Sequence, residues 1–322
     1  MKFNFRLYSC LLMVIMFAFS VPLLAQVPNL KWQEVTSKFG PLPNSIKVFE
    51  SENTYQDSAF KGFYVEIDTK DKNLQLDTDT TLFRRLTPKE FFTRLNQPLI
   101  VVNSSFFEFK RNTNVNVVVK NGLPVSYNIH DIPGKGKDTL TYTHVLGAAL
   151  GMDKKGRMDI AYTFTDSTNT NVMYQQLPMS AFKDSNAKLL STDPHLSEMS
   201  VWKLKWANGG GPVLMRSGRI QISNNEERKF AGKAINDYHP RTAMGYTMEG
   251  KLIIMAIQGR MKGIAVGATL NQMANFFEQL DCYEAINLDG GGSSCLLVNG
   301  KETIKPSDPT GQRPVPAVFY VK

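Results

Sequence analysis

Apolar and polar residues alternate along much of this chain with a period of two, which is typical of half-buried β-strands. Residues 63–68 show the alternation most clearly. The runs 99–102, 285–288, 295–298 and 315–321 are short and almost wholly apolar. Runs of that kind are consistent with strands that are buried on both faces. The pattern therefore predicts a protein dominated by β-structure.

Turn signals recur between the predicted strands. Five dipeptides ending in glycine occur along the chain, several of them between short β-rich runs: Asn121-Gly122, Lys155-Gly156, Ser217-Gly218, Glu249-Gly250 and Asn299-Gly300. Glycine tolerates the positive φ that tight hairpin turns require. We therefore expect several of these positions to close β-hairpins.

Helix signals are few. Thr87, followed by Pro88 and Glu90, has the spacing of a capping box at a helix start. Thr269 precedes a segment that continues to Leu280, with apolar residues on one face at helical spacing. We predict an α+β fold class: a β-rich mixed sheet with a few packed helices.

The domain organisation is predicted to be simple, because no linker or internal repeat divides the chain. Residues 26–60 contain several prolines and little periodicity, and we expect an irregular lead-in there. Residues 61–322 are expected to form a single catalytic domain. Polar stretches at 130–140 and 183–200 are expected to be surface loops.

The first 25 residues have the order of a secretory signal peptide. Lys2 and Arg6 precede an apolar stretch from Leu7 to Leu24, and Ala25 is small. The alternative is an uncleaved anchor helix, but Ala25 and the polar residues within the stretch favour cleavage. We expect an exported protein, periplasmic or extracellular, with no membrane span after cleavage.

Composition excludes several classes of protein. Of 322 residues, 42% are hydrophobic and 20% charged, which excludes a disordered or a polytopic membrane protein. The 37 basic and 29 acidic residues give a net charge of +8, but no dense basic run occurs, so no nucleic-acid partner is expected. Cys282 and Cys295 are expected to be small buried residues in preference to a disulfide.

The most informative motif is Asp289 followed by Gly290, Gly291, Gly292 and Ser293, directly after a predicted strand. Consecutive glycines cost conformational entropy, so a stable fold needs a reason for them. They let a ligand approach the main chain, and their N–H groups can converge on an anion. The alternative is an ordinary tight turn. No lysine follows as in a phosphate-binding loop, and a strand follows where a dinucleotide site requires a helix.

Three other polar residues are candidates for the same site. Arg241, after His239-Pro240, starts an apolar strand, and a guanidinium there can bind phosphate through two hydrogen bonds. Asn103 follows the apolar run 99–102, and Arg313 lies in a polar loop before the last strand. Each of them, taken alone, is also consistent with an ordinary turn or surface residue.

Together these segments resemble the phosphodiester glycosidase family. The resemblance rests on five strings that occur in order: VVNSSFF (101–107), GGGPVLMRSG (209–218), HPRTAMGY (239–246), INLDGGGSS (286–294) and PSDPTGQRPVPA (306–317). The fourth string, together with HPRTA, is the most specific. Residues 61–322 would then form a phosphodiester glycosidase-like domain.

The resemblance implies hydrolysis of a sugar C1–O–phosphate bond, as in an N-acetylglucosamine-1-phosphodiester. Asp289 would act as nucleophile, electrostatic partner or base. Arg241, assisted by Arg313 and the glycine turn, would hold the phosphate. His239 would protonate or bind the leaving group, and Asn103 would orient sugar hydroxyls.

A second carboxylate is left open, with Glu66 on the polar side of the strand 63–68 as the candidate. No cofactor and no catalytic metal are expected, because the aspartates lack the spacing of a calcium loop.

Two alternatives to the glycosidase function remain. One is a non-catalytic carbohydrate- or polymer-binding protein acting in exopolysaccharide or cell-wall processing. The other is a phosphodiesterase that cuts the other P–O bond. The partner expected from the resemblance is a sugar-phosphate or glycan substrate.

Overall fold

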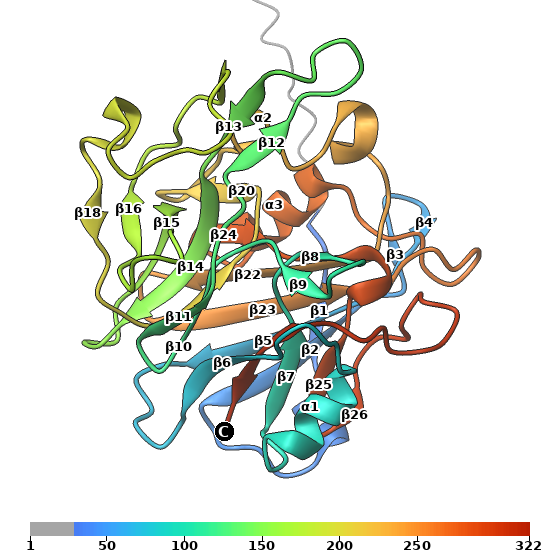
Figure 1. Cartoon of the computed structure of the whole chain (residues 1–322). Coiled ribbons are helices and arrows are strands. Elements are labelled where there is room, and N and C mark those ends of the chain that lie inside the picture. Colours follow the sequence, from blue (N-terminus) through green and yellow to red (C-terminus); the bar gives the residue numbers. More distant parts are fainter. Residues whose placement is uncertain (1–28) are drawn as a thin grey trace, which may run out of the picture.

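A computed structural model describes residues 29–322, which fold into several β-sheets with a few short helices packed around them (Figure 1). The α-helices are α1 (Pro88–Arg94), α2 (Asn224–Glu227) and α3 (Leu270–Gln279). The β-rich fold with few helices is confirmed. The expected mixed sheet is not, because all strand pairs among the described residues are antiparallel. The predicted signal peptide, residues 1–25, lies outside the described residues.

The largest sheet has eight strands, in the order β1 (Trp32–Glu34), β2 (Ile46–Ser51), β5 (Gly62–Asp68), β23 (Lys251–Ile257), β22 (Arg241–Thr247), β24 (Cys282–Asn287), β20 (Val213–Arg216) and β21 (Arg219–Ile220). Its first two strands correct the prediction that residues 26–60 are irregular. They pair with each other and then with β5, and the same segment also holds the short η1 (Thr36–Phe39), β3 (Thr54–Tyr55) and β4 (Ser58–Ala59).

Two further sheets cover one face of this sheet. One has the order β11 (Leu123–Ser126), β10 (Val118–Lys120), β19 (Leu204–Gly209), β14 (Gly147–Asp153), β15 (Met158–Phe164), β16 (Met173–Gln175), β18 (Ser200–Val201). The other has the order β26 (Lys301–Glu302), β25 (Leu296–Val298), β7 (Ile100–Asn103), β27 (Ala317–Val321), β6 (Leu76–Thr80). Their buried side chains form one core with the eight-stranded sheet. Trp206 of β19 and Phe319 of β27, with ring centroids 4.9 Å apart, join the two covering sheets.

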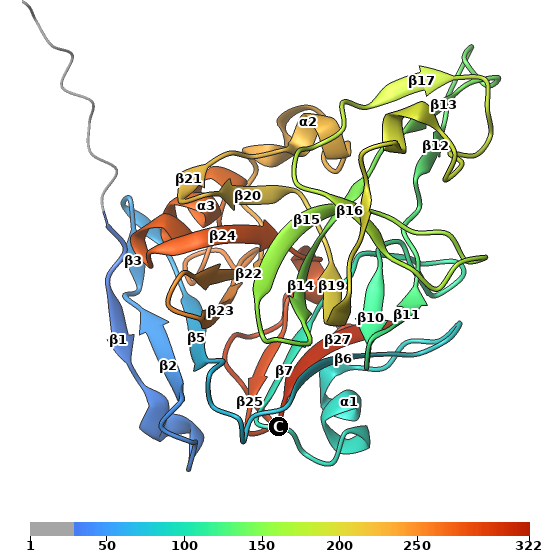
Figure 2. The same cartoon turned by 90° about the vertical axis from the view of Figure 1, so that its left-hand side faces the viewer.

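A small sheet projects from this body at the upper right of Figure 2. It consists of β12 (Asp131–Pro133), β13 (Tyr142–His144) and β17 (Phe182–Asp184). The stretches 130–140 and 183–200 therefore contain strands, as well as the short helix η2 (Pro194–Leu196), and are not loops throughout. A hairpin of β8 (Phe107–Glu108) and β9 (Thr113–Asn114) lies on another part of the surface.

The local signals in the sequence are confirmed. Thr87 and Thr269 both cap their helices through complete capping boxes. All five glycine dipeptides close hairpins between paired strands. Cys282 and Cys295 are buried and free. No helix within residues 29–322 is long and apolar enough to cross a membrane.

The strand ends that matter for function meet at one end of the eight-stranded sheet. Arg241, the first residue of β22, is opposite Ile257, the last residue of β23. Asn287, the last residue of β24, is opposite Ala243 of β22. The segments that follow β23 and β24 therefore emerge beside the start of β22, although they are distant in sequence.

Candidate active site

Asp289 is held in place by the backbone and by Asn103. Its N–H donates to the carbonyl of Ser104 (3.0 Å), and its own carbonyl accepts from Nδ2 of Asn103 (2.6 Å). Oδ1 of Asn103 accepts from the Thr242 hydroxyl (2.9 Å) and from the N–H of Cys295 (3.0 Å). Asn103 is buried, so the expectation that it orients sugar hydroxyls is corrected: its amide ties β7 to the Asp289 loop.

Each glycine after Asp289 has its own structural reason. A side chain at Gly290 would lie 2.9 Å from the carbonyl oxygen of Pro240. Gly291 has a φ of +61°, in the left-handed region, and its N–H donates to the same carbonyl (2.8 Å). A Cβ at Gly292 would lie only 2.2 Å from Nη2 of Arg313. Gly292 therefore leaves room for the Arg313 guanidinium to lie against the turn that follows Asp289.

The same geometry revises how the glycine turn can contact an anion. The N–H groups of Gly291, Ser293 and Ser294 all donate to carbonyls within the protein. Of the three glycines, Gly291 therefore has its N–H occupied by the carbonyl of Pro240, and the expectation that the turn contacts a phosphate now concerns Gly290 and Gly292. Three arginines in the same cavity can supply further contacts to an anion.

These residues line a cavity of about 220 Å³. Its walls are Phe106, Phe230, His239, Arg241, Arg260, Asp289, the three glycines and Arg313. Among these lining residues, Asp289 is the one acid, facing three arginines and a histidine. An excess of cationic donors around one carboxyl suits a substrate that brings its own negative charge.

Arg241 has its charge available for such a substrate. Its side chain is 2% exposed, and it donates to the backbone carbonyls of Ala268 and Asp237, both at 3.0 Å. Within residues 29–322 it has no carboxylate ion pair. Burial and the nearby Arg260 lower its pKa to about 10, which still leaves it charged at neutral pH.

Asp289 itself has an unusual acidity. Burial raises its pKa to about 7, while the Ser293 hydroxyl and Arg313 oppose the shift. Its Oδ2 is sealed from solvent and has no hydrogen-bond partner in the described part of the chain. A carboxyl whose pKa lies near neutrality can exchange a proton during a reaction.

His239 lies on the same wall and is kept neutral. Burial, Arg241 and Arg260 all lower its pKa. Its Nδ1 lies 3.3 Å from Nη2 of Arg260. Because a guanidinium can only donate, Nδ1 must accept, and the proton of the neutral ring is on Nε2.

Arg313 also lines the cavity. Its Nε donates to Oδ2 of Asp308 (2.7 Å), and its guanidinium lies 5.4 Å from the ring centroid of Phe109. Unlike Arg241, it is paired with an acid. The pair fixes the direction in which its remaining N–H groups point.

The structure separates Glu66 from this site. Its carboxylate pairs with Lys251 (2.9 Å). Glu66 is opposite Ile253, whereas Ile257 is opposite Arg241, and the four-residue offset corresponds to about 13 Å along the sheet. Glu66 is therefore not placed as the second carboxylate.

Sequence reasoning missed Arg260, Phe106 and Phe230. Arg260 follows β23 in a positive-φ conformation (+61°), and its guanidinium lies against Gly291. Nothing in its local sequence marks it as functional. Phe106 lies within the VVNSSFF string, and this position was the available signal for it.

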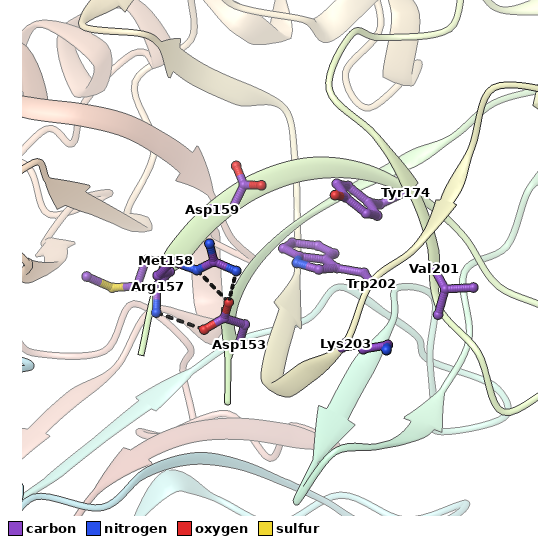
Figure 3. A pocket seen from close by; sticks show the side chains of 8 residues that line it. All are labelled: Asp153, Arg157, Met158, Asp159, Tyr174, Val201, Trp202 and Lys203. Atoms are coloured by element: carbon purple, nitrogen blue, oxygen red, sulfur yellow. Dashed lines mark hydrogen bonds and ion pairs between the residues drawn. The ribbon is translucent and has the colours of Figure 1, made fainter. Parts of the chain in front are cut away.

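A second cavity, of about 450 Å³, lies on the seven-stranded sheet and has a different character (Figure 3). Asp153 there is paired with Arg157 (2.7 Å), and Asp159 accepts from Gln176 (2.7 Å). The ring centroids of Tyr174 and Trp202 are 5.3 Å apart. Because both carboxylates already have partners, this larger cavity is a weaker candidate for catalysis.

No group of three or more potential metal-ligating side chains occurs within residues 29–322. The expectation that the reaction needs no metal and no cofactor stays a prediction.

Comparison with known proteins identifies related sequences. The sequence model of the phosphodiester glycosidase family matches residues 96–322. N-acetylglucosamine-1-phosphodiester alpha-N-acetylglucosaminidase from mouse is 35% identical over 34% of this chain and 20% of its own length. The human protein of the same name is 31% identical over 38% of this chain and 24% of its own length. The chain thus spans about a fifth to a quarter of these curated relatives.

Solved structures show the same fold. The catalytic domain of the zebrafish enzyme of that name, auto-inhibited by its pro-peptide, has a TM-score of 0.58 and 18% identity. The alignment covers 91% of this chain and 88% of that one. A hypothetical protein from Synechocystis has a TM-score of 0.55 and 16% identity, covering 91% of this chain and 68% of that one.

Proposed function

Because the chain belongs to the phosphodiester glycosidase family, we propose that it is an exported hydrolase of glycosyl-1-phosphodiesters, with N-acetylglucosamine as the sugar. The sugar is suggested by the names of the curated relatives. Export is suggested by the signal-peptide pattern of residues 1–25. The observation that carries the proposal is the cavity itself, in which three arginines and a neutral histidine face one carboxyl of raised pKa.

The arginines account for binding the phosphodiester. Its negative charge would lie between Arg241, which has no acid partner among the described residues, and Arg313, with Arg260 on the third side. Burial strengthens these charge-assisted hydrogen bonds relative to those in water. As the sugar C1–O bond breaks, negative charge grows on the departing phosphate. The same arginines would stabilise that charge more strongly in the transition state than in the bound substrate.

Asp289 would act on the sugar side of the bond. In its ionised form it stabilises the positive charge that develops at C1, and either attacks C1 or takes a proton from the attacking water. Its pKa near 7 gives it enough basicity for proton abstraction at neutral pH. The Nε2–H of neutral His239 would donate a hydrogen bond to the leaving phosphate.

The proposal is tested with an N-acetylglucosamine-1-phosphate methyl diester as substrate. Asp289→Asn keeps the shape of the side chain but not its charge, so we expect kcat/KM to fall roughly a thousandfold. Asp159→Asn is the matched control, because Asp159 is also a partly buried carboxyl of raised pKa, but it lies in the other cavity. Its activity should stay within a factor of about two of wild type.

The bond that breaks is identified by hydrolysis in heavy-oxygen water. Label in the sugar supports the glycosidase, whereas label in the phosphate identifies a phosphodiesterase and overturns the proposal. Tight binding of the diester without any product would instead identify a carbohydrate-binding protein.

A further inference from the structure

Two loops beside the cavity form a surface that the proposed hydrolysis does not use. One lies between β6 and α1, and the other joins β8 to β9. We call their basic and aromatic side chains the basic-aromatic rim: the exposed Phe83, Arg84, Phe109, Lys110 and Arg111, and the half-buried Arg85. The loops touch where Nδ2 of Asn112 donates to the carbonyl of Phe83 (3.4 Å) and where Arg85 lies 5.2 Å from the ring centroid of Phe109.

The rim is continuous with the cavity. The guanidinium of Arg313 lines the cavity and also lies 5.4 Å from the Phe109 ring centroid. Phe106, a few residues before Phe109 in the same segment, lines the cavity as well. A molecule that leaves the cavity past Arg313 therefore meets Phe109 and Arg85 next.

The apolar part of the rim is unusually exposed. Phe83 and Phe109 are 72% and 56% exposed, and the adjacent Leu82 is 74% exposed. Large apolar side chains that gather on a surface in this way mark a binding site more often than singly scattered ones do.

The charges of the rim have no acid partners. Within residues 29–322, Arg84, Arg85, Lys110 and Arg111 form no ion pair with a carboxylate. Glu108, the acid of the same hairpin, accepts from the backbone N–H groups of Lys110 and Arg111. The rim therefore presents uncompensated positive charge next to exposed aromatic rings, and it is complementary to an anionic partner.

We propose that the basic-aromatic rim binds the aglycone, the group on the far side of the phosphate, and that this aglycone itself contains further phosphodiesters. The substrate class would be a polymer of glycosyl phosphates, cleaved at the unit that enters the cavity. This inference rests on the proposed function. A cavity of about 220 Å³ accommodates little more than one sugar with its phosphate, so the next units must lie outside it. There the arginines and Lys110 meet the following phosphates, while Phe83 and Phe109 pack against sugar rings.

The test compares a short and a long substrate of the same sugar. The short one is the N-acetylglucosamine-1-phosphate methyl diester, and the long one is a tetramer of N-acetylglucosamine-1-phosphate units. We expect wild type to prefer the tetramer. The triple variant Arg84→Ala, Lys110→Ala, Arg111→Ala should lower the tetramer-to-methyl ratio of kcat/KM about tenfold, mainly through KM, because each exposed charge contributes modestly.

The control removes equal charge elsewhere. Lys154, Lys155 and Lys188 are exposed residues without carboxylate ion pairs in the described part of the chain, outside the rim. Changing all three to alanine should leave the ratio within a factor of about two, because distant exposed charges are screened at physiological salt. An unchanged ratio in the rim variant, or no preference of wild type for the tetramer, overturns the inference.

Two further measurements separate this inference from its rivals. If wild type binds vesicles containing phosphatidylglycerol, and the rim variant loses that binding while its substrate ratio is unchanged, the rim is a membrane surface and the inference is wrong. If neither substrate is cleaved, the proposed function fails. Calorimetry of tetramer binding then still tests whether the rim binds the polymer. About tenfold weaker binding by the rim variant supports the polymer ligand, and equal binding overturns it.

Discussion

Asp289 and Arg241 are both held by backbone groups, with their charges left largely uncompensated. Asp289 is fixed through its main chain, and its Oδ2 has no hydrogen-bond partner among the described residues. Arg241 donates to two carbonyl oxygens but pairs with no carboxylate in the same part of the chain. Burying such groups is unfavourable for folding, so residues of this kind are expected where function requires them.

The raised pKa of Asp289 has a consequence for stability that can be measured. Its pKa is about 7 in the folded protein and near 4 in the unfolded chain, so ionisation favours unfolding. The contribution of Asp289 to the stability of wild type should therefore fall as pH rises from about 4 to about 7, and the loss from this group is complete above that range. Asp289→Asn removes this penalty and should stabilise the protein by about 1–3 kcal/mol at pH 8, but hardly at pH 4.

Chemical unfolding at the two pH values measures the effect, and Asp308→Asn provides a control of opposite sign. The hydrogen bond to Arg313 lowers the pKa of Asp308, so that carboxylate stabilises the fold above its unfolded pKa. Its replacement should destabilise the protein at pH 8, and the effect should fade as pH falls through the folded pKa. A gain for Asp289→Asn that is equal at pH 4 and pH 8 would contradict the assigned pKa.

At the scale of single elements, the sequence was informative wherever local chemistry sets the structure. Thr87 and Thr269 start helices because their hydroxyls bond N–H groups three residues away. Glycine dipeptides close hairpins for reasons confined to the turn. The strands within 26–60 and 130–140 were missed because their stability comes from distant partners. In the small sheet, for example, His144 bridges Asp131 and Asp184 through its two ring nitrogens, at 2.8 and 2.9 Å.

The glycine turn after β24 allows a prediction that distinguishes its members. A methyl group at Gly292 would collide with the flexible end of the Arg313 side chain, whereas one at Gly290 would collide with backbone. Gly292→Ala should therefore displace the guanidinium without unfolding the protein. We expect kcat/KM for the methyl diester to fall about tenfold to a hundredfold, because catalysis is sensitive to displacements of about 1 Å.

Gly290→Ala should mainly lower the stability of the folded protein, because the carbonyl of Pro240 cannot move without shifting the start of β22. Thermal unfolding and activity, measured on both variants, separate the two effects. A Gly292→Ala protein with full activity would show that the position of Arg313 is unimportant for the reaction.

At the scale of the whole molecule, the site depends on long-range convergence. Its residues come from positions 103 to 313, and they meet because β22 begins where β23 and β24 end. Spacing along the chain does not determine which strand ends become neighbours, so convergence was expected only from the family resemblance. The local pattern had already singled out Asp289 and Arg241, and the resemblance assigned them to one site. It did not lead to Arg260, and it gave the buried Asn103 a direct role with the sugar that the structure does not support.

The shared core of the three large sheets predicts how the molecule unfolds. Trp206 is buried on β19 and packs against Phe319 of β27, so it joins the two covering sheets. Trp206→Ala leaves a large cavity and should destabilise the protein by about 3–5 kcal/mol. Trp206→Phe should destabilise the protein less, because it keeps a ring and removes an indole N–H that has no partner among the described residues.

Calorimetry should show one cooperative unfolding transition for both variants, shifted to lower temperature, since none of the three large sheets retains a closed core without the others. Two separate transitions would show instead that the sheets fold as independent units, and the site, whose residues come from both the eight-stranded and the five-stranded sheet, would then depend on their docking.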